Sequence, residues 1–107
     1  MTKKKDLSLG TVMVLHAIAR GFQYGFDIME ETGLTSGTIY PALDRLEGLG
    51  FARSEWEEAR IAHEEKRPAR RYYQITREGE QALATALERY RSLAPVDLKV
   101  RAEPRTT

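Results

Sequence analysis

The stretch from residue 35 to residue 50 constrains the fold most, because it predicts a short amphipathic helix with a marked start and a marked end. Three apolar residues recur at helical spacing and share one face: Ile39, Leu43 and Leu46. Pro41 limits how far back the helix can begin, since proline is tolerated in about the first turn of a helix. Gly48 and Gly50 predict its end, because glycine readily takes the left-handed conformation that closes helices.

The opposite face of this predicted helix is outward and consists of small or polar residues and one aromatic residue. Its members are Gly37, Tyr40, Pro41, Asp44 and Arg45. Small outward residues let a helix approach another molecule closely. The periodicity alone nevertheless favours an ordinary core helix with a solvated face, so the neighbouring segments must decide the interpretation.

The neighbouring segments give the order helix, tight turn, helix, hairpin. A short helix is predicted from about residue 24 to 31, and Gly33 closes it. After Gly50, residues 51–56 and 71–75 alternate in a way that favours two strands. This order is that of a winged helix-turn-helix, whose second helix enters the DNA major groove.

Residue identities in three stretches carry a family resemblance. The run from Gly37 to Glu47 reads Gly-Thr-Ile-Tyr-Pro-Ala-Leu-Asp-Arg-Leu-Glu, and residues 24–28 and 71–79 add two further matches. These stretches resemble the PadR family of bacterial transcriptional regulators, over roughly residues 7 to 94. The resemblance implies a mainly α fold with a β-hairpin wing, and a C-terminal helix that forms a dimer, often together with the first helix.

Two further helices are predicted outside the helix-turn-helix. Ser8 is a candidate N-cap for a helix from about residue 9 to 20, with apolar positions at Leu9, Val12, Leu15 and Ile18. Thr76 is a candidate N-cap for a last helix over residues 77–94. The apolar stripe of this last helix has little left to pack on in a small domain, and an exposed apolar patch usually marks an interface. We therefore expect a homodimer whose interface includes Leu9, Val12, Leu83, Leu87 and Tyr90.

Length and composition limit the remaining possibilities. The 107 residues fit one domain, which we place at residues 7–94 between a flexible basic arm (1–6) and a disordered tail (95–107). The chain has no cysteine and two histidines on separate predicted elements, so we expect no metal, no cofactor and no enzymatic activity. No apolar stretch approaches about 18 residues, which predicts a cytoplasmic protein.

These observations predict a sequence-specific DNA-binding regulator. The resemblance implies that it is a repressor that acts as a homodimer on a palindromic operator. The residues expected to contact DNA are Ser36, Thr38, Tyr40 and Arg45 on the helix, and Lys66, Arg67 and Arg70 on the wing. Tyr40 has a second interpretation, in which its ring is half buried against the preceding helix.

Two other functions stay open at this point. The net charge of +1, the long acidic segment at residues 57–70 and Asp44 on the outward face favour a winged-helix module that binds protein instead of DNA. Some members of the family bind aromatic compounds between subunits, so a ligand-sensing adaptor with an unknown small-molecule inducer is the other alternative, with Trp56 as a candidate lining residue.

Overall fold

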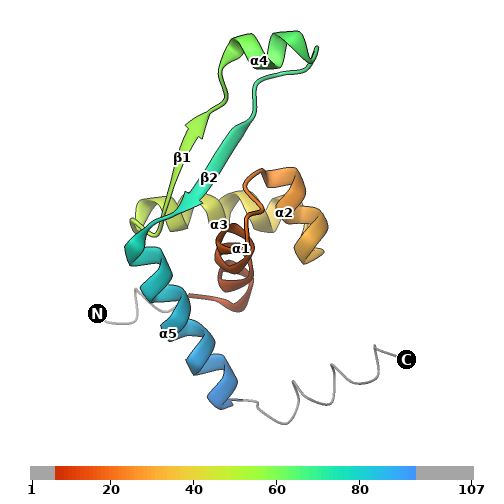
Figure 1. Ribbon diagram of the computed structural model, residues 1–107. Helices are drawn as coiled ribbons and strands as arrows, with labels where there is room; N and C mark the ends of the chain where they lie inside the picture. Colours follow the sequence, from red (N-terminus) through yellow and green to blue (C-terminus); the bar gives the residue numbers. More distant parts are fainter. Residues whose placement is uncertain (1–6, 94–107) are drawn as a thin grey trace.

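The computed structural model describes residues 7–93, in which helices surround one central helix and a two-stranded wing projects from them (Figure 1). The elements follow the order α1 (Leu9–Ala19), α2 (Gly25–Thr32), α3 (Ser36–Gly48), β1 (Ala52–Trp56), α4 (Ala59–Glu64), β2 (Arg71–Ile75) and α5 (Arg77–Leu93). The predicted arm and tail lie outside the described residues. The mainly α fold with a β-hairpin wing is confirmed.

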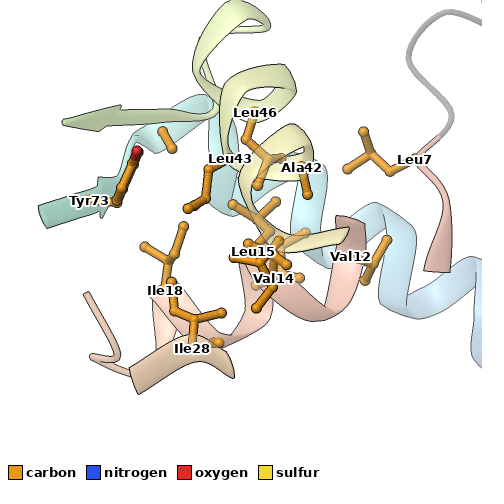
Figure 2. Packing of buried hydrophobic residues seen from close by; sticks show 14 of the residues in the cluster. Leu7, Val12, Val14, Leu15, Ile18, Ile28, Ala42, Leu43, Leu46 and Tyr73 are labelled. Carbon is orange, nitrogen blue, oxygen red and sulfur yellow. The ribbon is translucent and has the colours of Figure 1, made fainter. Parts of the chain in front are cut away.

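Helix α1 is the centre of the core and contacts α2, α3, α5 and β2. It begins as predicted at Ser8, whose hydroxyl oxygen accepts a hydrogen bond from the Thr11 N–H at 3.2 Å. Figure 2 shows its apolar side chains packed among those of the neighbouring elements. The largest fully buried side chains of the domain are Val14, Leu15, Ile28, Ile39, Leu43 and Leu46. Leu9, predicted to share the stripe of α1, is instead 55% exposed.

The helix-turn-helix formed by α2 and α3 agrees with the prediction except for the place of Pro41 within α3. Gly33, with φ +78°, ends α2. Helix α3 already begins at Ser36, so Pro41 lies in its second turn and not its first. Proline has no N–H, so the Gly37 carbonyl lacks its usual helical donor. Both residues lie on the exposed face, where water can take that role.

The wing is an antiparallel pair in which Ala52 lies opposite Ile75 and Trp56 opposite Arg71. Tyr73 points into the core, whereas Tyr72 lies on the other face and meets the Tyr24 ring edge-on, with 6.1 Å between the ring centroids. The sequence predicted no helix between the strands, but residues 59–64 form helix α4 at the far end of the wing (Figure 1).

Helix α5 packs on α1 more closely than its surplus of apolar residues suggested. Leu83 and Ala86 are buried, and the Tyr90 hydroxyl donates to the Leu7 carbonyl at 2.9 Å. At its start, the Thr76 hydroxyl oxygen accepts from the Gly79 N–H at 3.0 Å, which confirms the predicted cap. Most of the apolar stripe of α5 is therefore buried within the chain, and Leu87 is the member that stays exposed, at 36%.

Candidate nucleic-acid interface

The outward face of α3 has the composition that the periodicity predicted. The core side of the helix is fully buried, and every predicted outward residue is exposed, as are the expected DNA contacts Ser36, Thr38, Tyr40 and Arg45. Glycine and proline contribute little bulk here, so α3 presents a low surface with a few longer side chains. Such a surface fits the requirement of a helix that lies deep in a groove.

Tyr40 combines the two positions that the sequence left open. The residue is 46% exposed, yet its phenol ring lies against the backbone of Gly25, the first residue of α2. Its hydroxyl therefore lies at the seam between α2 and α3.

A hollow of about 460 Å³ lies beside Tyr40, between the helix-turn-helix and the wing. None of its lining residues is acidic, two are arginines and four are aromatic: Gly25, Phe26, Tyr40, Trp56, Ala69, Arg70, Arg71 and Tyr73. Trp56 is 63% exposed, and Phe26 is exposed to a similar extent. Exposed aromatic rings can pack against sugars, and the guanidinium groups beside them can bind phosphates. The hollow therefore extends the candidate DNA-contacting surface from α3 toward the wing.

Arg71 fastens the wing to α3 on one side of this hollow. Its Nε donates to the Ser54 hydroxyl at 2.9 Å, and that hydroxyl donates to the Glu47 carboxylate at 2.8 Å. A terminal nitrogen of Arg71 lies 3.6 Å from Glu47, and its guanidinium carbon is 5.5 Å from the centroid of the Trp56 ring. Sequence reasoning missed Arg71 and Phe26 as site residues, because their place in one hollow depends on how the wing folds onto α2 and α3.

The three predicted wing cations do not share one role. Arg67 is held by Glu57 through two hydrogen bonds, at 2.7 and 2.8 Å, and the two side chains are only 20% and 9% exposed. The Arg67 hydrogen bonds hold the pKa of the Glu57 carboxyl at about 2, against an ordinary value of 4.5. This pairing occupies the Arg67 guanidinium within the wing, whereas the other two predicted cations are exposed.

Lys66 and Arg70 are the exposed members of that set. Arg70 stacks its guanidinium over the Tyr24 ring, 4.9 Å from the centroid, while its backbone N–H donates to Glu57 at 3.2 Å. Lys66 follows the end of α4, with φ +56°. Arg70 is thus the predicted wing cation that lines the hollow, and Lys66 lies nearer the tip.

A comparison with known families identifies the chain. Residues 14–85, more than half of the sequence, match the model described as the transcriptional regulator PadR-like family. The chain belongs to this family. The match includes α2, α3, the wing and the first half of α5, so the helix-turn-helix and hollow described above are those of a PadR-like regulator.

Solved structures share the PadR-like fold at low sequence identity. A PadR family transcription regulator from Clostridium difficile superposes with a TM-score of 0.71 at 21% identity, covering 87% of this chain and 98% of the other. A PadR family transcriptional regulator from Eggerthella lenta gives 0.66 at 24% identity, covering 87% and 81%. A Streptococcus mutans protein gives 0.69 at 21% identity, covering 89% and 88%. No curated protein matches the chain.

The residues expected at a dimer interface of this PadR-like chain divide into two groups. Val12 and Leu83 are buried in the chain's own core, which corrects the expectation that they offer a surface to a partner. Leu9 and Leu87, at 55% and 36% exposed, keep such a surface, and Tyr90 is partly buried. Tyr90 also lines an open groove of about 440 Å³ along α5.

Other kinds of site find no support in the described residues. Between residues 7 and 93, His, Asp and Glu side chains form no group of three that could hold a metal ion. In the same part of the chain, no helix is long and apolar enough to cross a membrane.

Proposed function

We propose that this PadR-like regulator is a sequence-specific repressor that binds a palindromic operator as a homodimer. The observation that carries the proposal is the exposed, low outward face of α3 with Tyr40 beside the cationic hollow. In this arrangement α3 enters the major groove, where Arg45 contacts a guanine or a phosphate, and Ser36 and Thr38 hydrogen-bond to phosphates or base edges.

The wing supplies positive charge locally, although the net charge of the chain is low. A net charge of +1 gives little overall attraction to DNA, so local positive charge must supply the phosphate contacts. Lys66 and Arg70 are exposed and suited to that role, whereas Arg67 stabilises the wing itself. Arg71 holds the wing at a fixed position beside α3, so that both can meet the same duplex.

The homodimer is supported by the apolar surface that residues 7–93 leave exposed. Leu9 and Leu87 are the exposed members of the expected interface, and Tyr90 adds a partly buried ring. A twofold pair would present two copies of α3 to half-sites about 34 Å apart, roughly one turn of DNA. Occupation of such a site in a promoter would block transcription.

The acidic wing tip favours a second candidate, a winged-helix module that binds protein. Exposed carboxylates gather around α4 at Glu58, Glu64 and Glu65, and Asp44 adds another on α3. Trp56, exposed at the hollow, similarly favours a ligand-sensing adaptor. Both alternatives predict a chain that does not read DNA by itself.

Selection of bound sequences from random duplex DNA tests the proposal. A DNA reader enriches one palindromic motif and binds random duplex at low salt with strong salt dependence. Arg45→Ala and Tyr40→Phe then test whether α3 is the element that contacts the bases. Loss of affinity for the selected motif, with non-specific binding and melting temperature unchanged, assigns base contacts to α3. If neither folded variant loses affinity for the motif, α3 is not the reader, and absence of binding by the wild-type chain favours the protein module.

A further inference from the structure

Gly25 stands where a side chain would collide with the Tyr40 ring as it is placed. It is the buried first residue of α2, and a Cβ atom built on it would lie 2.7 Å from Tyr40 Cζ and 3.0 Å from Cε1, and closer still to the hydroxyl oxygen. Favourable carbon contacts in proteins are about 3.5–4.0 Å. Any side chain at this position would therefore displace the Tyr40 ring or push α2 away from α3.

The need for glycine here concerns space and not backbone conformation. The described glycines with positive φ are Gly21, Gly33 and Gly50, and Gly25 is not among them. It lies in the first turn of a regular helix, where alanine would normally be favoured over glycine. The contact with Tyr40 is thus the feature of the structure that accounts for glycine at this position.

The position of the Tyr40 ring bears on the DNA-reading face. Tyr40 is the largest side chain on the outward face of α3, and it forms one wall of the hollow that also contains Arg70 and Trp56. The hydroxyl end of the ring lies nearest Gly25, and the residue as a whole remains 46% exposed. A ring turned outward would instead stand above the low surface of α3 and hold the helix away from DNA.

We propose that Gly25 is a positioning residue for DNA recognition. It gives the hydroxyl end of the Tyr40 ring the space to approach α2, which sets the direction of the hydroxyl and keeps the outward face of α3 low. This inference rests on the proposed function and adds to it a residue of α2 that contacts no DNA itself.

The test is a double-mutant cycle of Gly25→Ala and Tyr40→Ala, with affinity for the selected motif and thermal melting measured on all four proteins. In the wild-type background, Gly25→Ala should weaken binding roughly ten- to hundredfold, the effect of losing a hydrogen bond to a charged group. In the Tyr40→Ala background it should change affinity less than about twofold, because the ring that it displaces is gone. Tyr40→Phe is unsuitable for this cycle, since Cζ remains.

Gly48→Ala is the matched control, because Gly48 is also helical and a Cβ there meets no atom within 4 Å. It should leave binding unchanged and not lower the melting temperature. A purely structural Gly25 would lower the melting temperature without affecting the affinity of the folded protein, and this outcome overturns the proposal. Equal losses from Gly25→Ala in both backgrounds overturn it as well, since the effect would not pass through Tyr40.

Folding of the variants separates the remaining outcomes. If Gly25→Ala does not fold, restoration of folding by Tyr40→Ala supports the contact, and a double variant that stays unfolded refutes it. If the wild-type chain binds no DNA at low salt, the proposed function fails. The melting temperatures of the same four proteins would then still report whether Gly25 and Tyr40 are coupled, so the two failures are distinguishable.

Discussion

Both carboxylate oxygens of Glu57 accept hydrogen bonds from the two terminal nitrogens of Arg67, at 2.7 and 2.8 Å. The paired geometry is the strong one for guanidinium and carboxylate groups. Around it, the Glu57 N–H donates to the Arg70 carbonyl at 2.7 Å and the Arg70 N–H returns a bond to the Glu57 side chain at 3.2 Å. The nine residues between the pair are thereby closed into a defined wing tip that includes α4.

Acid should open this wing tip. The Glu57 pKa of about 2 lies below the ordinary value of 4.5, so the pairing stabilises the tip fully above about pH 4.5 and is lost as the pH falls toward 2. Trp56 is the single tryptophan of the chain and the neighbour of Glu57, so its fluorescence should report the opening. Glu57→Gln should show the altered emission already at neutral pH and no transition in this window. A transition of equal size in Glu57→Gln would assign the change to other carboxylates.

Neutralising the exposed wing cations should reduce the salt dependence of DNA binding. Lys66→Gln and Arg70→Gln should each lower the slope of log affinity against log salt by about one unit per protomer, uniformly over DNA sequences. Arg60→Gln is the control, because Arg60 on α4 already pairs with Glu58 at 3.1 Å and Glu64 at 3.7 Å. An unchanged slope for Arg70→Gln would mean that the acidic residues keep the wing off DNA.

The same substitution at two positions of α5 should separate assembly from folding. Leu87 is 36% exposed, so Leu87→Asp should leave the monomer folded but place a charge in the proposed interface. Sedimentation should then show a monomer, and a binding assay should show that affinity for the operator is lost. Leu83 is buried in the chain's own core, so Leu83→Asp should unfold the protein. A wild-type chain that sediments as a monomer at tens of micromolar would refute the dimer.

Gly79 should tolerate no side chain. A Cβ there would lie 2.8 Å from Ile75 Cγ1 and 2.9 Å from the Phe51 carbonyl carbon, and would overlap the Phe51 oxygen. Because backbone cannot move aside as a side chain can, Gly79→Ala should lower the free energy of unfolding by about 1–3 kcal/mol in urea titration. Gly48→Ala should raise it by up to about 1 kcal/mol, since that site is open and helical. If Gly79→Ala and the wild-type protein have equal free energies of unfolding, α5 can shift away from Phe51.

Local signals predicted most of the fold. Ser8 and Thr76 begin α1 and α5, and Gly33 ends α2, because caps and left-handed glycines act within one turn of the chain. The short helix α4 escaped prediction, since its six residues carry no clear apolar stripe and its closing pair joins residues ten apart. Pro41 was misjudged because its exposed face lets water replace the missing helical hydrogen bond.

The site was predicted less completely, because periodicity shows which face is apolar but not what covers it. Val12 and Leu83 were expected to meet a second subunit, yet α1 and α5 cover each other within one chain. Arg67 was predicted to contact DNA, but in the folded wing its guanidinium pairs with Glu57. The approach of Tyr40 to Gly25 likewise depends on the angle at which α2 and α3 meet, which local sequence does not encode.

The enclosure of α1 by α2, α3, α5 and β2 has a consequence for how the molecule opens. Amide protons in the middle of α1, near Val14 and Leu15, can reach solvent only when every neighbouring element has moved away, so their deuterium exchange should follow the global free energy of unfolding. Helix α4, at the far end of the wing, should exchange through a separate local opening. The wing tip can therefore open while the centre of the domain stays closed.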